Sequence, residues 1–422
     1  MANGFSKEER VAFEQLLEGF QDALVMSRNV SIYNTDQTMM ERSNDTIWRP
    51  QPYIAVSYSG SNATSNFKDV TQLAVPSTIS IQRHVPWVLN AKELRDMLNE
   101  GRISQSAEQR LASDINQSVV DVAAFQGSIF IKRGTATGFD DVAAIEAAMN
   151  ERGIMFEDRK LVLSTRDYNA LASDLSKASR SFGNDISDPA LRKSFLGEIA
   201  SFATYKADYL RRKTAAAGGG SITISTLDGA SNYNPKATST AVTLEVSNVD
   251  NRFQTVTVSS TTNVVAGDAF TIANVNQVHM ITKEDTGILK TFRVVEVVNG
   301  TTMVITPPII SNQVANDAAA QYQNCVVTSK SGTAALVFQN TVTGYMNPFW
   351  HKDSIEILPG RLAVPADAGA AVMRATTDNG VEVVMQKQFD INTQTTKYRL
   401  DTLYGVVNKQ PEMSGIIMFN QT

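Results

Sequence analysis

The sequence contains few of the residues that most catalytic and metal centres require. It has one cysteine, Cys325, and three histidines, His84, His279 and His351, among 422 residues. A single cysteine cannot form a disulfide within the chain, which excludes a secreted disulfide-stabilised scaffold. A structural metal site needs about four ligands at characteristic spacings, and no histidine has a second histidine or a cysteine at such a spacing. We therefore expect no metal site and no cofactor, and interpret Cys325 as a small buried apolar residue.

Long apolar runs and phosphate-binding motifs are also missing. No stretch approaches the roughly 18 apolar residues of a membrane span, and the first residues, MANGFSKEERVAF, lack the apolar core of a signal peptide. Neither G-x-x-x-x-G-K-[ST] nor G-x-G-x-x-G occurs. We expect a soluble protein with no membrane partner, made in a reducing cytoplasm.

Charge is sparse and slightly negative. The chain carries 38 Lys and Arg against 43 Asp and Glu, a formal net charge of −5, and 19% of its residues are charged. A free-standing nucleic-acid-binding protein presents a basic face, so this balance argues against one. The adjacent carboxylates at 140–141 and 284–285 are interpreted as a helix N-cap and a polar turn, so we expect no enzyme.

The first 30 residues predict one isolated amphipathic helix. Its apolar residues recur at near-helical spacing: Val11, Phe13, Leu16, Leu17, Phe20 and Leu24. Glu14, Glu18 and Asp22 fall four residues apart and so share another face. A solvated helix face explains this spacing, and the alternative is a docking strip for a basic partner helix.

The next segments predict a long hairpin and a long helix. The polar run SGSNATSN indicates a hairpin tip, and strand alternation returns over residues 77–85 until Pro86 ends it. A short helix follows Asn90 and stops at Gly101. The strongest helical stripe then covers residues from about 104 to 126.

A mixed α/β region follows. A helix is predicted from about Asp140 to Arg152, with Asp140 as its N-cap and Gly153 after its C-terminus. The strand KLVLST and the helix RDYNALASDL come next. The cluster 211–213 (Arg-Arg-Lys) is interpreted as the solvated end of a helix.

Residues 218–340 differ in character from the rest. They include 14 charged residues in 123, against 67 in the other 299. Short strands follow one another: SITIST, AVTLEV, RFQTVTVSS, DAFTIANV, TFRVVEVV and TMVITPPII. Asn299-Gly300 favours a type I′ hairpin turn, and the pattern predicts a small all-β barrel or sandwich. The preceding TAAAGGGS is typical of a flexible linker, so one domain is predicted to be inserted into another.

Four stretches of the sequence carry a specific pattern. They are RSNDTIWRP (42–50), VDNRFQTVTVSSTTNVVAGDAFTIANV (249–275), RVVEVVNGTTMVITP (293–307) and NPFWHKDSIEILPG (347–360). In content and order they resemble the major capsid (coat) proteins of short-tailed double-stranded-DNA bacteriophages. The resemblance extends almost from end to end. It implies an α+β, Hong-Kong-type coat fold with an inserted all-β barrel domain.

The resemblance also implies a division into domains. Residues 1–30 resemble the N-terminal arm, and residues 31–135 the peripheral domain, with an extended loop at about 47–85 and a spine helix at about 104–126. Residues 136–217 and 331–365 resemble the axial domain, 218–330 the inserted β-barrel domain, and 366–422 the C-terminal strands of the peripheral domain.

The implied function is that of a major capsid protein. Copies would form hexameric and pentameric capsomers of an icosahedral shell, assembled in the host bacterial cytoplasm as a procapsid that later expands. The implied partners are the chain itself, a scaffolding protein and a portal at one vertex, with DNA enclosed but not specifically bound. Glu14, Glu18 and Asp22 would dock the basic scaffold helix. Asp228, Lys236, Glu245 and Asp250 would lie on the inserted-domain loop that contacts neighbouring capsomers.

Two other functions are weighed against this one. A β-rich carbohydrate-binding adhesin on an α/β carrier would show aromatic clusters in the β region, but Trp48, Trp87 and Trp350 all lie outside it. A hydrolase with unrecognised carboxylates would show turnover that single Asp or Glu substitutions abolish.

Overall fold

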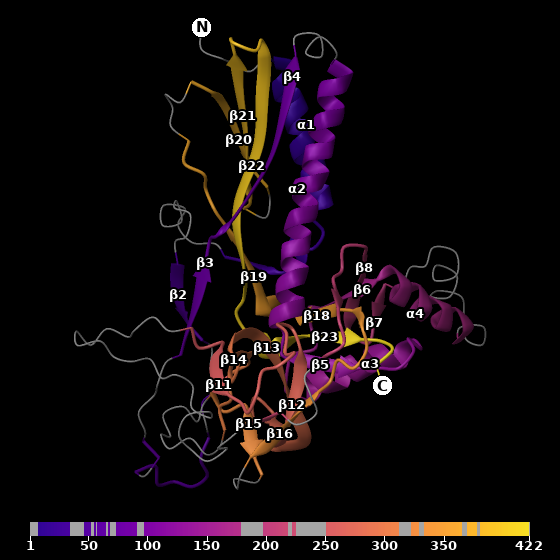
Figure 1. The fold of residues 1–422 in the computed structure, drawn as a ribbon, viewed down its shortest axis with the longest axis vertical. Coiled ribbons are helices and arrows are strands. Elements are labelled where there is room, and N and C mark those ends of the chain that lie inside the picture. The colour runs from indigo at the N-terminus through magenta and orange to yellow at the C-terminus, as the bar shows by residue number, and fades with distance from the viewer. Residues whose placement is uncertain are drawn as a thin grey trace. The chain divides into compact units, whose positions relative to one another are not determined.

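The structure is a computed structural model of the whole chain, drawn in Figure 1. It describes residues 7–33, 46–51, 55, 57–64, 66–67, 73–90, 97–178, 197–217, 222–224, 250–311, 322–328, 333–364, 369–377 and 380–421. The chain divides into two compact units. The first comprises Met1–Ile47, Ser77–Val120 and Ile355–Val407, and the second Trp48–Pro76, Asp121–Ser354 and Asn408–Thr422.

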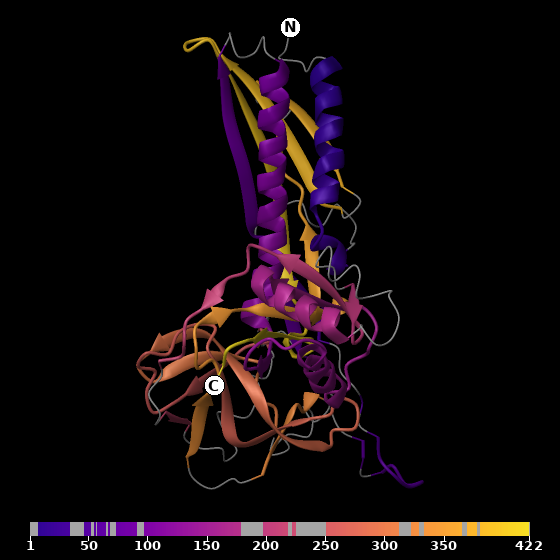
Figure 2. The same ribbon diagram turned by 90° about the vertical axis from the view of Figure 1, so that its right-hand side faces the viewer.

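The first unit is a sheet covered by two helices. Its strands are β1 (Ser31–Ile32), β19 (Ile355–Pro359), β22 (Thr395–Asn408), β21 (Glu382–Asp390) and β20 (Ala371–Thr376), with β4 (Ile81–Asn90) also paired to β22. Figures 1 and 2 show α1 (Lys7–Ala23) and α2 (Met97–Gln126) side by side along this sheet. A short 3-10 helix, η1 (Ser27–Asn29), leads from α1 to β1.

The N-terminal helix is confirmed, and it docks on its own unit. Phe13, Leu16 and Phe20 are buried, as an isolated helix of this length needs in order to be stable. Val11 is 53% exposed, so the buried stripe is narrower than predicted. Glu9 receives hydrogen bonds from Lys387 and Tyr398 of the sheet, which fixes the start of the helix.

The spine helix is longer than the sequence predicts. α2 runs for 30 residues without a break, so the prediction that Gly101 stops a helix is wrong. A glycine inside a helix costs only about 1 kcal/mol relative to alanine, which does not end a helix of 30 residues here. The predicted stripe is confirmed further along, where Leu111, Ile115 and Val119 are buried.

The prediction that Pro86 ends a strand is also wrong. β4 continues to Asn90, and Pro86 lies opposite Arg399 of β22. Among the described strands β4 pairs with β22 alone, so it lies at the edge of the sheet. A proline, which has no N–H to donate, is tolerated at such an edge.

The second unit contains an α/β frame. Its sheet has the order β5 (Ile129–Lys132), β23 (Ser414–Met418), β18 (Asn347–His351), β6 (Arg159–Ser164), β8 (Phe202–Ala207), β7 (Glu198–Ile199). The helices α3 (Phe139–Glu151) and α4 (Thr165–Ala178) pack on it through Ile145, Met149 and Leu171. Two 3-10 helices, η6 (Lys352–Ser354) and η7 (Pro411–Met413), complete the frame.

The start of α3 differs from the prediction by a small shift. The N-cap is Gly138, and Asp141 accepts hydrogen bonds from the backbone N–H groups of Thr137 (2.6 Å) and Gly138 (3.1 Å). The prediction that Asp140 is the N-cap is therefore wrong. Asp141, the third residue of the helix, binds back to the N–H of the N-cap and of the residue before it. Gly153 follows the helix with φ +76°, as predicted for its C-terminus.

The inserted region forms a closed barrel. Its strands follow the order β10 (Thr223–Ile224), β16 (Ala334–Phe338), β12 (Ala269–Val278), β13 (Asp285–Asn299), β14 (Thr302–Thr306), β11 (Gln254–Thr257), with β15 (Cys325–Val327) also paired to β12. A bridge between Ile224 and Val258 joins the first strand to the end of the last. Phe270, Phe292 and Ile305 are among the buried residues that fill the interior. The alternation predicted from the sequence is thus the inward and outward alternation of barrel strands.

The β13–β14 hairpin is confirmed, but its turn is not of type I′. Asn299 pairs with Thr302, so the loop consists of Gly300 and Thr301. Neither Gly300 nor Thr301 has a positive φ, which a type I′ turn requires at both loop residues. The side chain of Asn299 instead accepts a hydrogen bond from the backbone N–H of Thr301 at 3.0 Å.

The chain crosses between frame and barrel on two adjacent strands. β9 (Arg212–Lys213) leads toward the barrel and pairs antiparallel with β17 (Gly344–Tyr345), which leads back. This pairing is the geometry of an inserted domain, whose two ends lie close together. The interpretation of residues 211–213 as a helix end is wrong, because Arg212 and Lys213 form a strand.

Three expected boundaries differ from where the strands lie. β16 ends at Phe338, so the barrel extends past residue 330. β2 (Thr46–Pro50) and β3 (Ala74–Thr78) form the base of the extended loop, whereas β4 belongs to the first unit's sheet. β23 lies in the frame, although residues 366–422 were all expected in the peripheral domain. The other boundaries stay predictions.

The barrel's closure predicts which fragment folds. Residues 222–340 expressed alone are expected to unfold cooperatively in urea, as followed by circular dichroism. Residues 222–330 are expected not to fold, because they lack β16, which pairs with both β10 and β12. Equal stability of the two fragments would show that β16 does not close the barrel.

Candidate functional site

The contact between the barrel and the frame combines an apolar cluster, in which Ala269 of β12 packs with Phe130 and Ile416, with buried polar side chains. β12 and β13 of the barrel meet the end of α3, the start of β5 and the 3-10 helix η7 of the frame. Apolar contact alone would allow the barrel to slide on the frame, whereas hydrogen bonds fix a direction. The residues of this contact are called the junction below: Ser128, Arg152, Gln277, Lys290, Thr291 and Glu412.

An ion pair lies at the centre of the junction. Lys290 of β13 is 2% exposed, and its Nζ donates to Glu412 Oε1 at 2.5 Å and to the carbonyl of Asn324 at 3.0 Å. Burial lowers the pKa of Lys290, and the nearby Glu412 carboxylate opposes that change. Burial also acts to raise the pKa of Glu412, but the attraction of Lys290, Arg152 and Lys283 outweighs it and brings that pKa below its ordinary value. Each partner is thus placed as the other's counter-ion within the junction.

Arg152 joins three elements beside this pair. Its Nε donates to Gln277 Oε1 at 2.9 Å, its Nη1 to Ser128 Oγ at 3.1 Å and its Nη2 to Thr291 Oγ1 at 3.2 Å. Thr291 in turn donates to the carbonyl of Ser128 at 2.7 Å. Burial lowers the pKa of Arg152 to about 10, which still leaves the guanidinium charged at neutral pH.

A second buried arginine caps the C-terminal end of α2. Arg293 of β13 donates from Nη2 to the carbonyl of Ala124 at 3.0 Å and to that of Gly267 at 3.0 Å. The last carbonyls of a helix have no partner within the helix, and a cation there is favourable. The barrel thus supplies a donor to the last turn of α2, which belongs to the second unit from Asp121 onward.

The two crossing strands have their own buried polar cluster. Lys213 of β9 pairs with Asp268 at 2.9 Å and donates to the carbonyl of Ala266 at 2.8 Å. Asn340 donates to Asp268 at 3.0 Å and accepts from the backbone N–H of Ala269 at 3.1 Å. Lys213, expected at a solvated helix end, is therefore buried and structural.

Gly153, at the end of α3, has no side chain and so allows the barrel to approach closely. A Cβ at this position would lie 2.7 Å from the His279 ring of the barrel, and the φ of +76° also favours glycine. The next contact along the chain is a hydrogen bond from the Met280 N–H to the Arg152 carbonyl at 2.9 Å. The C-terminus of α3 and the β12–β13 turn are therefore in direct contact.

The cysteine and histidines do not form a reactive centre in the described residues. Cys325 is fully buried in β15, and burial raises the pKa of its thiol to about 12, so little thiolate forms at neutral pH. His84, His279 and His351 lie on β4, after β12 and on β18. Within the part of the chain that the structure describes, no three His, Cys, Asp or Glu side chains are grouped to hold a metal ion. None of the described helices has the length and apolar content of a bilayer span.

The acidic face of α1 is partly described. Glu14 and Glu18 are exposed, on the side away from the buried stripe. Asp22 belongs to the same helix, but its side chain lies outside the described residues.

A buried glutamate lies where α1 meets α2. A Cβ at Gly19 would lie 2.5 Å from Glu108 Oε1, and Glu108 is only 7% exposed. Burial raises the pKa of Glu108 to about 7.

The inter-capsomer candidates are mostly outside the described residues, namely Asp228, Lys236 and Glu245. Asp250 is described, and its carboxylate accepts hydrogen bonds from Arg252 Nε at 3.0 Å and Nη2 at 2.8 Å. Arg252 also donates to the carbonyl of Asn408 at 3.0 Å. Asp250 is thus already paired within its own chain.

Sequence reasoning missed the junction residues. Lys290 and Glu412 lie 122 residues apart, and nothing local connects them. One available signal was the presence of Lys290 and Arg293 in strand-forming segments of a region that is otherwise poor in charge. A charge in such a strand is expected to have a buried partner or to face solvent.

Comparison with known proteins shows which class of protein this chain belongs to. Residues 1–420 match the family described as P22 coat protein, gene protein 5. Among solved structures, a chain of Mycobacterium phage Che8 is 8% identical, with 93% of this chain and 90% of that chain covered at a TM-score of 0.47. The capsid of cyanophage P-SCSP1u is 11% identical, with 93% and 87% covered at a TM-score of 0.45. The CUS-3 coat protein I-domain is 36% identical over 29% of this chain and 99% of that chain, at a TM-score of 0.23.

The match over nearly the whole chain defines a bacteriophage coat protein, which builds a shell from repeated copies and is a component of the virion capsid. The chain belongs to the P22 coat protein family. This family consists of structural proteins, which favours the coat function over the adhesin and hydrolase alternatives.

The ion pair of the junction predicts a large loss of stability on removal of one partner. Glu412→Gln leaves Lys290 buried without a counter-ion, which is expected to lower the free energy of unfolding by about 3–5 kcal/mol in urea titrations. Glu284→Gln, at an exposed glutamate of the barrel, is the matched control and is expected to have no effect. An unchanged midpoint for Glu412→Gln would contradict the role of the pair.

Burial of Glu108 predicts pH-dependent docking of α1. Because its pKa in the folded chain is about 7, against 4.5 for the ordinary group, the folded state favours the protonated form. Its contribution is complete below pH 4.5 and is lost as the pH rises through 7. Hydrogen exchange of α1 amides is expected to be roughly 5- to 30-fold faster at pH 8 than at pH 5.5, after correction for intrinsic rates.

The variant Glu108→Gln is expected to remove this pH dependence, since an amide carries no charge. Glu14→Gln, on the exposed face of α1, is expected to keep it. The same pH dependence in Glu108→Gln as in the unaltered chain would exclude Glu108 as its source.

Proposed function

We propose that this coat protein assembles with a scaffolding protein, in the host bacterial cytoplasm, into a procapsid that later expands around DNA. The observation that carries the proposal is the two-sided character of α1. One side is buried on the chain's own sheet and helix, while Glu14 and Glu18 face outward. Such an acidic strip on an already ordered helix offers a basic partner a surface with little loss of conformational entropy.

Capsomers need contacts that close into rings. In the proposal, copies of the chain form hexamers and pentamers through heterologous contacts, with a portal replacing one pentamer. The extended loop based on β2 and β3 adds contact area on a second copy. Its residues 57–64 are exposed in the single chain, which leaves them free for such contacts.

Contacts between capsomers are assigned to the inserted domain. Asp228, Lys236 and Glu245 are the proposed charged residues of its loop. Asp250 is held by Arg252 within the chain, so in the proposal it anchors the end of this loop.

The charge balance suits a container for DNA. A net charge of −5 gives the chain no general attraction for phosphates, so DNA is enclosed without specific binding. Expansion of the shell is then a movement of folded parts, with no covalent chemistry required of the chain.

Charge reversal tests the proposed docking strip. The triple variant Glu14→Lys, Glu18→Lys and Asp22→Lys is expected to reduce scaffold-directed shells roughly tenfold at about 0.1 M salt, because the basic partner is repelled. The measurement is the amount of closed shells seen by negative-stain electron microscopy after mixing with scaffold.

The matched control reverses three other exposed glutamates, Glu157, Glu198 and Glu284, and is expected to assemble normally. Both variants are expected to remain folded by circular dichroism. Normal yields of closed shells from the Glu14, Glu18 and Asp22 variant would remove the docking proposal.

A further inference from the structure

The two ends of the extended loop meet at one hydrogen bond. The backbone N–H of Gln51, just after β2, donates to the carbonyl of Leu73, just before β3, at 2.7 Å. Gln51 and Leu73 are therefore the points at which the extended loop begins and ends. This pair of residues is called the loop root below.

A tyrosine of the inserted domain binds both sides of the loop root. The Tyr322 hydroxyl donates to the carbonyl of Gln51 at 3.2 Å and accepts from the backbone N–H of Leu73 at 3.3 Å. Its ring packs with Leu73 and Ile310, and Tyr322 is only 7% exposed. A hydroxyl can donate and accept at once, which is what two backbone groups of opposite kind require.

Tyr322 is itself fixed to the junction. Asn324, two residues on, exchanges hydrogen bonds with Ile310: its N–H donates to the Ile310 carbonyl at 3.0 Å, and its Oδ1 accepts from the Ile310 N–H at 3.1 Å. The carbonyl of Asn324 accepts from the buried Lys290 at 3.0 Å. A continuous chain of contacts thus runs from the ion pair to the loop root.

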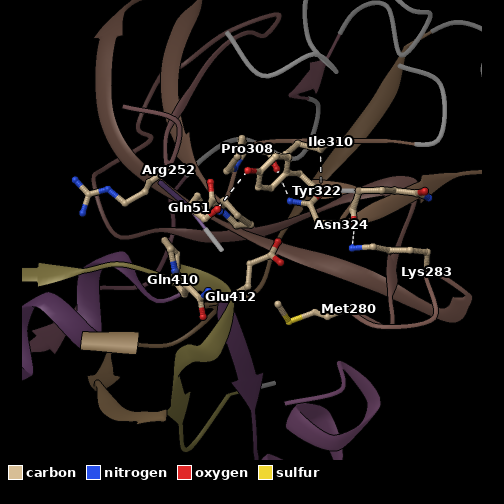
Figure 3. A pocket seen from close by; sticks show the side chains of 13 residues that line it. Gln51, Arg252, Met280, Lys283, Pro308, Ile310, Tyr322, Asn324, Gln410 and Glu412 are labelled. Atoms are coloured by element: carbon tan, nitrogen blue, oxygen red, sulfur yellow. Dashed lines mark hydrogen bonds between the residues drawn. The ribbon is translucent and has the colours of Figure 1, made fainter. Parts of the chain in front are cut away.

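Packing alone does not hold the loop root. Figure 3 shows Gln51 and Tyr322 beside a pocket of about 60 Å³, with Gln410 and Glu412 on its other side. This space is sufficient for one or two water molecules. Because a void adjoins Gln51, the position of Gln51 depends on its hydrogen bonds to Tyr322 and Leu73 more than on packing against neighbouring atoms.

We propose that Tyr322 is a positioning residue through which the inserted barrel sets the direction of the extended loop, and so the curvature of the assembled shell. This inference rests on the proposed function, in which the loop contacts a second copy. It adds that the barrel acts on assembly from within its own chain, in addition to any contact that it makes with neighbours.

The unaltered protein provides the first test. By hydrogen exchange, the amide of Leu73 is expected to be protected while the amides of residues 57–64 exchange quickly, because these residues are exposed. Exchange of Leu73 at the rate of residues 57–64 would show that Tyr322 does not hold the loop root.

Tyr322→Phe is the second test. Phenylalanine keeps the ring contacts with Leu73 and Ile310 and removes both hydrogen bonds. Exchange at Leu73 is expected to become roughly 3- to 10-fold faster, with exchange in the barrel core at Phe270 and Phe292 unchanged. After mixing with scaffold, the distribution of particle diameters is expected to broaden, with open sheets beside closed shells.

Two controls separate the hydroxyl from packing. Ile310→Val trims the ring's neighbour but keeps both hydrogen bonds, and Tyr345→Phe removes a hydroxyl away from the loop root. Both are expected to give shells of the parental diameter.

The outcomes distinguish this inference from the proposed function. Failure of the unaltered chain to form shells with scaffold would contradict the proposed function. Normal shells from the unaltered chain and from Tyr322→Phe alike, with faster exchange at Leu73 in the variant, would overturn the positioning role. Unchanged exchange at Leu73 in Tyr322→Phe would overturn the hydrogen bonds on which it depends.

Discussion

The buried ion pair between Lys290 and Glu412 is the interaction on which the second unit depends. The inserted barrel is joined to the frame by only two covalent crossings, β9 and β17, which lie side by side. Two adjacent strands alone would not fix the orientation of the barrel relative to the frame. Directional contacts at a distance from these strands are needed to fix it, and Lys290, Glu412 and Arg152 supply them.

Polar contacts of this kind add little to stability when compared with an apolar core of equal volume. Their advantage here is direction, since a fork of guanidinium donors or a short ion pair tolerates only a narrow range of geometry. A coat protein repeats one chain many times, so an error in the orientation of its barrel would be repeated at every contact. We regard the junction as a means of specifying orientation, with stability supplied mainly by the apolar interiors of barrel and frame.

Much of the fold could be predicted from the sequence, because the spacing of apolar residues within each segment indicates its helices and strands. The stripe of α1, the stripe of α2 from Leu111 onward and the alternation of the barrel strands all follow from a single buried face. At Gly101 the cost of one glycine was too small to end a long helix, and at Pro86 the edge position of β4 made an N–H donor unnecessary. Asp140 was misplaced because the exact ends of helices are weakly encoded. The cluster at 211–213 was misinterpreted because nothing local in the sequence shows that Lys213 pairs with Asp268.

The candidate site was much less accessible to sequence analysis. Its partners lie up to 163 residues apart, as for Thr291 and Ser128, and no pattern of spacing brings them together. Family resemblance identified the arm, the loop and the inserted domain, but it did not identify the side chains that join them. Those became visible only through burial and hydrogen bonds in the folded chain.

The central claim is that barrel and frame form one body, held by the junction. It is tested most directly by an electron cryomicroscopy reconstruction of the assembled shell at side-chain resolution. The account predicts that the contact between Lys290 and Glu412 persists in every subunit of the shell, with the same barrel orientation relative to the sheet of β5, β23, β18 and β6. A barrel that rotates on this sheet from one subunit to the next, with the contact broken in some of them, would contradict it.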